Sequence, residues 1–194
     1  MASLHKNDIY LGNPRLKKAN VTLDYTEEQI KELARCAKDI KYFCNNYMKI
    51  VNVDEGLMNF TSYPFQDKII DSVQKNRFTI CKMPRQSGKT TVMTALILHF
   101  ALFNESFNVA VLANKAATAR EILHRIQLAF EYLPTWMQQG IVEWNKGNLE
   151  LENGSKILAG ATSSGSVRGG SFNIIYLDEF AFVPSHQQQE FFAS

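Results

Sequence analysis

A segment near the middle of the chain, Met83-Pro-Arg-Gln-Ser-Gly-Lys-Thr90, has the residue types that bind phosphate. It matches the pattern GxxxxGK[ST] at every fixed position except the first, where Met83 stands in place of glycine. Gly88 lets the backbone approach an anion without a Cβ atom, and the N–H groups that open a following helix attract negative charge. Lys89 can reach β- and γ-phosphates, and the Thr90 hydroxyl can join a Mg²⁺ shell. The segment therefore predicts a nucleoside-triphosphate site.

Two adjacent carboxylates follow an apolar run nearer the C-terminal end of the sequence. Residues 173–177 predict a buried parallel strand, and Asp178 and Glu179 come directly after it. Ligands of open α/β sheets bind outside the carboxyl ends of the strands. We expect Asp178 to hold Mg²⁺, directly or through water, and Glu179 to orient and deprotonate an attacking water. Together with the phosphate segment, this pair predicts hydrolysis of ATP.

Three further polar side chains fit such a site by their type and position. Arg85 adds a positive charge next to the expected γ-phosphate position, and Arg168 lies in a glycine-containing segment, residues 165–170, that can present a charge. Gln66 lies just before the first core strand, and a side-chain amide can both donate to and accept from an adenine edge. Each also has a plainer interpretation, as a loop arginine or an exposed helix glutamine.

The elements that must position these residues alternate between helix and strand from residue 64 onward. The residue patterns predict helices over 64–74, 89–103 and 116–132, and strands over 77–82, 108–112, 143–144, 148–151, 156–159 and 173–177. A turn at 152–154 predicts a hairpin between two of these strands. Upstream, residues 1–24 read as an irregular arm, 26–48 as one helix capped by Thr26, and 49–63 as mixed.

This order predicts an α/β fold, a P-loop NTPase with a mainly parallel sheet and right-handed crossovers. The N-terminal helical segment would form an appendage. We expect residues 1–60 to be an arm and helical subdomain, and residues 61–194 to be the ATPase core.

Composition limits the remaining classes of protein. The chain has 194 residues, 45% hydrophobic and 21% charged, with a net charge of +2, which is ordinary for a soluble protein and too mild to indicate nucleic-acid binding. Its three cysteines, Cys36, Cys44 and Cys81, indicate neither a disulfide framework nor a zinc site, and we expect Cys81 to be in the core. We find no signal peptide and no apolar stretch long enough to span a membrane.

These residues together resemble the ATPase domain of the large terminase subunit of T-even-like tailed bacteriophages, over about residues 12–182. The segments that carry the resemblance are Arg85-Gln-Ser-Gly-Lys-Thr-Thr91, Gly140-Ile-Val-Glu-Trp-Asn-Lys-Gly147, Leu151-Glu-Asn-Gly-Ser155, Val167-Arg-Gly169, and Ile175-Tyr-Leu-Asp-Glu179 followed by Ala181-Phe182. The segment 140–147 is unusual and therefore specific.

The resemblance implies an ATP-driven motor that moves double-stranded viral DNA into the prohead. Members of the family assemble as a homo-oligomeric ring at the portal vertex, so the portal protein and the small terminase subunit are the implied partners, and ATP and Mg²⁺ the implied cofactors. The implied location is the host cytoplasm, at the prohead portal, with no membrane contact.

The resemblance also assigns roles to individual residues. Lys89 and Thr90 correspond to the Walker A residues, and Asp178 and Glu179 to the Walker B aspartate and the catalytic glutamate. The implied ATP-binding residues are Gln66, Arg85, Gln86, Ser87, Gly88, Lys89, Thr90 and Thr91. Gln66 corresponds to an adenine-recognising glutamine. Arg85 corresponds to an arginine finger that acts within the subunit and Arg168 to one that reaches a neighbour's ATP, and these two remain alternatives.

Family members continue with the rest of the ATPase domain and a C-terminal nuclease, whereas this sequence ends at Ser194. We therefore expect a sheet that is incomplete after the Walker B strand, weak ATPase activity and no nuclease activity in this chain. Two other functions stay open. One is a truncated, non-catalytic nucleotide-binding or assembly module. The other is a superfamily 2 nucleic-acid helicase, because residues 113–118 resemble its motif Ia, although residues 178–181 match neither DEAD nor DEAH.

Overall fold

The computed structural model describes residues 5–52, 55–162 and 169–193. Its N-terminal third contains two short hairpins and three helices: β1 (Ile9–Tyr10), β2 (Asn13–Lys17), α1 (Glu27–Lys38), α2 (Ile40–Tyr47), β3 (Lys49–Asn52), β4 (Gly56–Asn59) and α3 (Pro64–Lys75). The rest alternates helix and strand: α4 (Lys89–Phe103), β5 (Asn108–Ala113), α5 (Ala116–Glu131), β6 (Ile141–Trp144), β7 (Asn148–Leu151), β8 (Lys156–Ala161), β9 (Ile174–Asp178), a 3-10 turn (Phe180–Phe182) and α6 (Ser185–Ala193).

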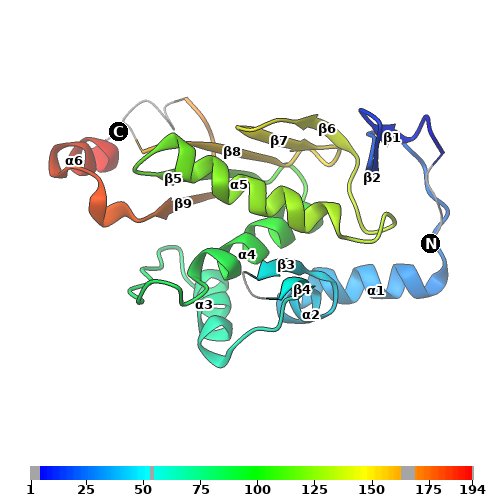
Figure 1. Ribbon diagram of the computed structural model, residues 1–194, viewed down its shortest axis with the longest axis horizontal. Coiled ribbons are helices and arrows are strands. Elements are labelled where there is room, and N and C mark those ends of the chain that lie inside the picture. Colours follow the sequence, from blue (N-terminus) through cyan, green and yellow to red (C-terminus); the bar gives the residue numbers. More distant parts are fainter. Residues whose placement is uncertain (1–4, 53–54, 163–168, 194) are drawn as a thin grey trace.

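The main sheet has five strands in the order β6-β7-β8-β5-β9 (Figure 1). The strands β8, β5 and β9 run parallel, with Ala113 level with Ala161 on one side and Asp178 on the other. The strands β6 and β7 extend the sheet as an antiparallel hairpin that pairs with β8. The predicted α/β class is confirmed. The sheet as a whole is mixed. Its three parallel strands, β8, β5 and β9, are the ones that lead to the predicted site.

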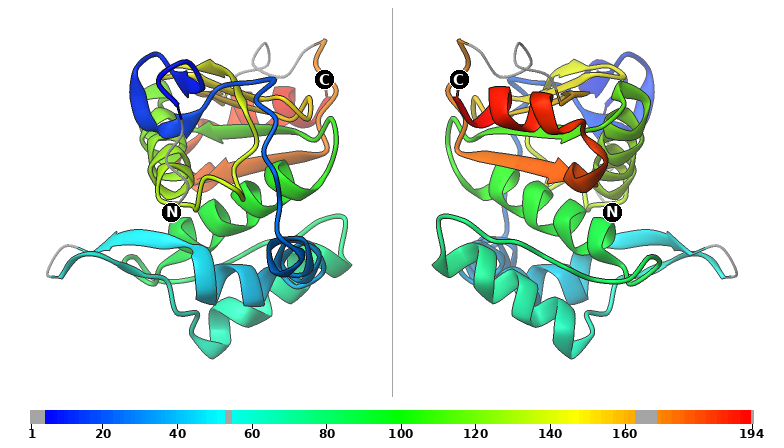
Figure 2. Two further views of the ribbon diagram at one scale, coloured as in Figure 1. Left: turned by 90° about the vertical axis from the view of Figure 1, so that its right-hand side faces the viewer. Right: turned by 90° about the vertical axis from the view of Figure 1, so that its left-hand side faces the viewer.

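Helices cover the two faces of the sheet unequally (Figure 2). Alternate residues of a strand point to opposite faces, and along β5 Val109 and Val111 join the main core with α4 and α5. Ala110 and Leu112 face the other way and form a small cluster with Phe191 of α6. The main core is therefore the layer between the sheet and the helices α4 and α5, and it also includes side chains of α1, α2 and α3.

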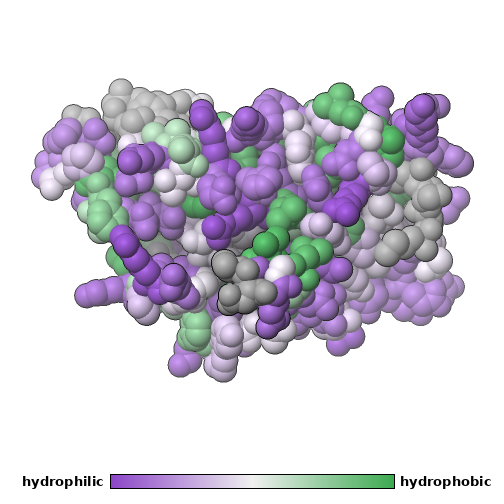
Figure 3. Space-filling view, in the orientation of Figure 1, coloured by the Kyte–Doolittle hydropathy of each residue, from purple (hydrophilic) through white to green (hydrophobic). Residues whose placement is uncertain are grey.

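The helix α4 matches the predicted range of 89–103 and is the central helix of the core. Nine of its fifteen residues are buried, so it is apolar on nearly all sides, as expected for a helix enclosed by other elements. The helix α5 is amphipathic: Ile122, Ile126 and Phe130 are buried, whereas Arg120 and Arg125 on its outer side are exposed. The face that carries α5 is largely hydrophilic, with small, separate apolar spots (Figure 3).

The single helix predicted over residues 26–48 is wrong, because the chain breaks at Asp39. This residue has extended backbone angles, and its N–H donates to the carbonyl of Arg35 at the end of α1. Its carboxylate accepts from the N–H of Tyr42 at the start of α2, over 2.9 Å. An aspartate that caps the next helix explains why a continuous apolar stripe is split in two. The predicted Thr26 cap is confirmed, and it forms a capping box with Gln29.

The predicted strand over residues 77–82 is also wrong. The segment connects α3 to the phosphate loop without forming a strand, and Phe78 and Ile80 are 80% and 95% exposed. Cys81, expected in the core, is exposed as well. The local residues favour a strand, but a strand requires a hydrogen-bonded neighbour. Among the described residues, β9 has a partner only on its β5 side.

Polar contacts, some of them buried, attach β2 to the far end of the sheet. The carboxylate of Glu152 accepts from Lys17 Nζ at 3.1 Å, from the N–H of Gly140 at 2.6 Å and from the N–H of Asn20 at 3.1 Å. The amide of Gln138 accepts from the N–H of Lys17 at 3.3 Å. It also donates to three backbone carbonyls, those of Arg15, Phe130 and Leu133. We call Lys17, Gln138 and Glu152 the N-terminal clamp.

Within the described part of the chain, no helix is both long and apolar enough to cross a lipid bilayer.

Candidate functional site

The predicted phosphate loop is the connection that leads directly into α4. Gly88 is the residue before the helix, with φ of +73°, and Gln86 has φ of +59°, so two left-handed residues curl the backbone just before the first turn. The Ser87 hydroxyl donates to the carbonyl of Pro84 over 2.9 Å and closes the loop on itself. The first N–H groups of a helix have no partner within the helix, and they attract anions. The backbone here has the curled form that backbone anion sites use.

The side chain of Lys89 bends back over this loop. Its Nζ donates to the carbonyl of Pro84 at 2.7 Å and to that of Met83 at 3.2 Å. An ammonium group has three donors, so an anion at the loop would take over these bonds or share the lysine with them. The lysine is thus held at the loop by contacts within the loop.

Gln66, from the first turn of α3, packs against the same loop. Its side chain is only 3% exposed. Its Oε1 accepts from the N–H of Tyr63 at 2.9 Å, and its Nε2 donates to the carbonyl of Gly88 at 3.4 Å. A Cβ atom at Gly88 would lie 2.5 Å from that Nε2. Glycine at this position therefore satisfies both a left-handed backbone and a close neighbour.

Phe65, beside Gln66, is 40% exposed and stacks on Tyr63 with ring centroids 5.6 Å apart. A stacked aromatic pair thus stands at the start of α3, next to the glutamine that contacts the loop.

The acidic pair lies where β9 ends, and its two members have different environments. Asp178 pairs with Ala113 of β5, and its Oδ1 accepts from the Tyr176 hydroxyl at 2.7 Å. Glu179 is exposed and has φ of +50°, a left-handed conformation that is uncommon for residues other than glycine and concentrates at functional sites. One carboxylate is thus anchored and the other projects from a sharp turn.

Tyr176 lies between the acidic pair and the helix that follows the phosphate loop. Its hydroxyl donates to Asp178, and Thr90 of α4 is close enough to influence its pKa. Burial raises the pKa of Tyr176 far above its usual range. The hydrogen bond to Asp178 and the charge of that residue raise it further, whereas Thr90 opposes the rise. The phenol therefore stays protonated and acts as a donor to Asp178.

The oxygen atoms gathered here fit a magnesium ion. Thr90 and Asp178 offer a hydroxyl and a carboxylate, which are hard oxygen ligands. Among the described residues, no three His, Cys, Asp or Glu side chains cluster into a metal-binding group. A metal at this place would therefore be held by one or two protein oxygens and by the phosphates of a ligand, which is how proteins usually bind Mg²⁺.

The structure brings together Gln66, Gly88 and Lys89 at the loop, and it places Tyr176, which is bonded to Asp178, near Thr90. Arg85 is exposed on the loop. Arg168 lies outside the described residues. Sequence reasoning missed Tyr176, although a signal was present. A residue two positions before Asp178 on the same strand shares its face, and a tyrosine hydroxyl there reaches a carboxylate.

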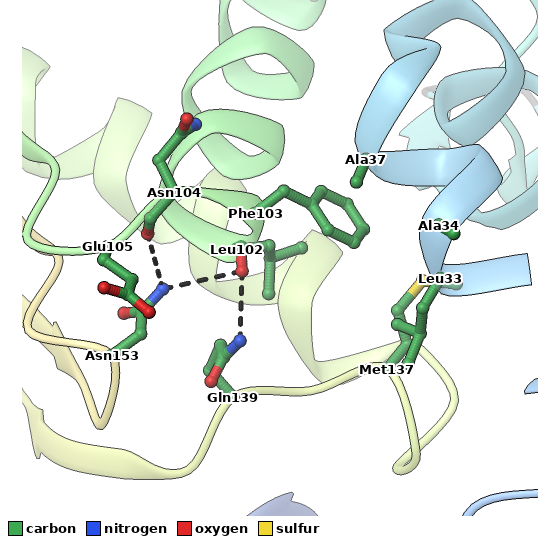
Figure 4. Close-up of a pocket in the computed structure, with 10 residues that line it drawn as sticks. All are labelled: Leu33, Ala34, Ala37, Leu102, Phe103, Asn104, Glu105, Met137, Gln139 and Asn153. Carbon is green, nitrogen blue, oxygen red and sulfur yellow. Dashed lines mark hydrogen bonds between the residues drawn. The ribbon is translucent and has the colours of Figure 1, made fainter. Parts of the chain in front are cut away.

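A separate pocket of about 490 Å³ lies away from this loop, between α1, the end of α4 and the turn at Asn153 (Figure 4). Its wall combines apolar side chains such as Leu33 and Met137 with amides that are already bonded. Gln139 donates to the carbonyl of Leu102 at 3.1 Å, and Asn153 donates to that of Asn104 at 2.8 Å. Because this pocket has no cationic side chain to bind phosphate, we place the candidate site at the loop.

A comparison with protein-family models identifies the family of the chain. The model described as terminase large subunit, T4likevirus-type, N-terminal, matches residues 80–193, which include both segments and more than half of the chain. This protein therefore belongs to the family of T4-like terminase large subunits, and the matched region corresponds to their N-terminal part.

Proposed function

We propose that this chain binds ATP with Mg²⁺ at the loop of residues 83–90 and hydrolyses it as part of a motor that packages double-stranded viral DNA. The family to which the chain belongs supports the packaging role. The observation that carries the ATPase proposal is the position of Tyr176, which donates to Asp178 and lies close to Thr90, so that the acidic strand end is near the helix that follows the phosphate loop. The proposed fold is that of a P-loop NTPase.

Each residue of the proposed site has a separate task. The N–H groups at the start of α4 and the ammonium of Lys89 would bind the phosphates, with Gln86, Ser87 and Thr91 around them. Thr90 and Asp178 would hold Mg²⁺, which when bound neutralises charge on the β- and γ-oxygens.

Glu179 projects into solvent at the strand end, where it would orient a water molecule and take its proton. Arg85, on the loop, and Arg168 are the two candidates for the cation that stabilises charge developing on the transferred phosphoryl group. Gln66 and Phe65 would lie at the adenine side.

We further propose double-stranded DNA, the portal protein and the small terminase subunit as partners, and a ring of identical subunits as the working assembly. Tight coupling of hydrolysis to DNA movement would require that assembly.

A non-catalytic nucleotide-binding or assembly module is the second candidate. It is favoured by the unformed strand at residues 77–82 and by the outer edge of β9, which has no partner strand among the described residues. Backbone groups that lack a ladder partner hold a strand end less firmly. An error near 1 Å in the position of a reacting group costs on the order of 100-fold in rate.

The test is a calorimetric titration of ATP into the protein and its Lys89→Ala variant. We expect the variant to lose at least about 100-fold in affinity, because the phosphates lose their ammonium partner. Lys82→Ala is the matched control, since Lys82 is an exposed lysine of the preceding segment, and its affinity should not change. Equal affinities in the protein and in Lys89→Ala would overturn the proposed site.

Turnover separates the two candidates. If the protein hydrolyses ATP, Glu179→Gln should keep binding and lose at least about 100-fold in rate, the low end for removal of a general base. Binding of ATP with no turnover in the parent protein, with or without proheads and linear DNA, would instead support the non-catalytic module.

A further inference from the structure

The hydrogen bond from Tyr176 to Asp178 has a defined direction. A phenol has one proton, and the 2.7 Å bond to Asp178 Oδ1 uses it, because an ionised carboxylate can only accept. Thr90 of α4 lies close enough to the same phenol to influence its pKa. The phenol is thus near both proposed metal ligands, and its proton is committed to Asp178.

The phenol is near two elements that carry the two proposed metal ligands. Thr90 is in the first turn of α4, and Asp178 is the last residue of β9, at the edge of the sheet. Tyr176 lies level with Val111 of β5, whose side chain is in the main core, and the tyrosine ring packs against that core. The ring is thus fixed by packing, and its hydroxyl is bonded to Asp178.

The hydrogen bond from Tyr176 leaves Asp178 able to bind a cation. Asp178 uses Oδ1 toward the tyrosine, and the described hydrogen bonds include none to Oδ2. The phenol therefore orients the carboxylate and leaves its second oxygen open for a metal.

We propose that Tyr176 is a positioning residue for Mg²⁺, which sets the Asp178 carboxylate in place before the ion and nucleotide arrive. This inference rests on the proposed function and adds a residue that acts through a ligand. Hydrogen bonds of this kind to metal ligands contribute about 10- to 100-fold in metal affinity. The contribution is specific to the ion, because the phosphate loop itself does not contact the phenol in the described hydrogen bonds.

The test compares Tyr176→Phe with the parent protein, using a non-hydrolysable ATP analogue in calorimetric titrations with saturating Mg²⁺ and with EDTA. The measured quantity is the Mg²⁺ ratio, which is the affinity with saturating Mg²⁺ divided by the affinity in EDTA. We expect affinity in EDTA to stay within about twofold and the Mg²⁺ ratio to fall by about tenfold or more. Combining Tyr176→Phe with Asp178→Asn should remove the difference, since the phenol then has no carboxylate to orient.

Tyr47→Phe is the matched control. Tyr47 also donates its hydroxyl to a carboxylate, Glu32 Oε2, over 2.8 Å, but far from the loop and in contact with Trp136. This variant should leave the Mg²⁺ ratio unchanged while it lowers thermal stability about as much as Tyr176→Phe does. A Mg²⁺ ratio in Tyr176→Phe within about threefold of the parent would overturn the positioning role and leave the proposed function intact. Absence of any nucleotide binding by the parent protein would overturn both.

Discussion

The N-terminal clamp and the phosphate loop lie at opposite ends of the molecule in Figure 1, and both are built on side chains that bond to backbone groups. In the clamp, Gln138 is 2% exposed and bonds to four backbone groups, and Lys17, itself 3% exposed, is paired with Glu152. In the loop, the described hydrogen bonds of Lys89 go to carbonyls of its own loop, and Arg85 is exposed. Buried polar groups that are hydrogen-bonded stabilise the fold, whereas the accessible polar groups of the loop are the ones that we propose for a ligand.

The hydrogen-bond donors of the clamp explain why Glu152 is ionised. Burial opposes ionisation, but the N–H groups of Gly140 and Asn20 and the ammonium of Lys17 outweigh it and lower the pKa of Glu152. The clamp therefore stays ionised and bonded at neutral pH. It ties residues to one another that are more than a hundred positions apart in sequence.

The largest effect should come from the clamp. Replacing Gln138 with leucine removes four hydrogen bonds in a buried place and leaves carbonyls and one N–H without that partner. Each buried unsatisfied group costs about 1 to 3 kcal/mol, and water will restore part of this, so we expect a total loss of about 3 to 4 kcal/mol in urea unfolding. Nucleotide affinity of the folded protein should not change.

The control for this variant is Gln139→Leu. The neighbouring Gln139 makes one described hydrogen bond, to the carbonyl of Leu102. It should therefore cost about 1 kcal/mol. Equal losses in the two variants would show that the clamp is no more important than an ordinary partly buried amide.

A second prediction concerns the loss of stability at low pH. It involves a residue of α4, the helix that begins at the phosphate loop. His99 is 4% exposed and its Nε2 bonds to the carbonyl of Cys36 over 2.8 Å, while its ring is surrounded by Phe43, Phe100 and Phe103. Burial lowers the pKa of His99 to about 4, although the Cys36 carbonyl and the charge of Asp39 work in the opposite direction.

The sign of the effect follows from the lowered pKa. The unfolded chain binds a proton at His99 near pH 6.5, whereas the folded chain keeps the imidazole neutral until about pH 4. Stability from this residue is therefore complete above pH 6.5 and is lost as the pH falls toward 4, by up to about 3 kcal/mol. The measurement is urea unfolding at several pH values in the parent protein and in His99→Leu. The free energy of unfolding of the variant should fall less steeply as the pH decreases. If it falls in parallel with that of the parent protein, the lowered pKa of His99 is contradicted.

The smallest expected effect on stability is at the loop. Arg85→Ala removes an exposed side chain and should change the free energy of unfolding by less than about 0.5 kcal/mol. If Arg85 is the arginine finger, the same variant should lower ATP turnover by a factor of about 1,000 or more. Arg125→Ala is the control, because Arg125 is an exposed arginine paired with Glu121 on α5 and should alter neither quantity beyond this range. Unchanged turnover in Arg85→Ala would leave Arg168 as the candidate.

Local sequence was sufficient wherever an element carries its own signals. The helices over 89–103 and 116–131, the strand β5 and the hairpin between β7 and β8 follow from runs of apolar residues and a turn at residues 152–154. The family could also be recognised from short segments, and the match to residues 80–193 confirms it. In these regions propensity, pattern and environment agree, so local rules suffice.

Only the tertiary structure decided the features that depend on a distant partner. Residues 77–82 have strand-forming side chains, yet they form no strand, because a ladder needs a second strand and propensity cannot provide one. The pairing of Lys17 with Glu152 spans 135 positions, and no spacing rule connects them. The closeness of Tyr176 to Thr90 depends on how β9 lies relative to α4. Residue types and short spacings thus predicted the chemistry, whereas the packing of distant elements decided which of those groups meet.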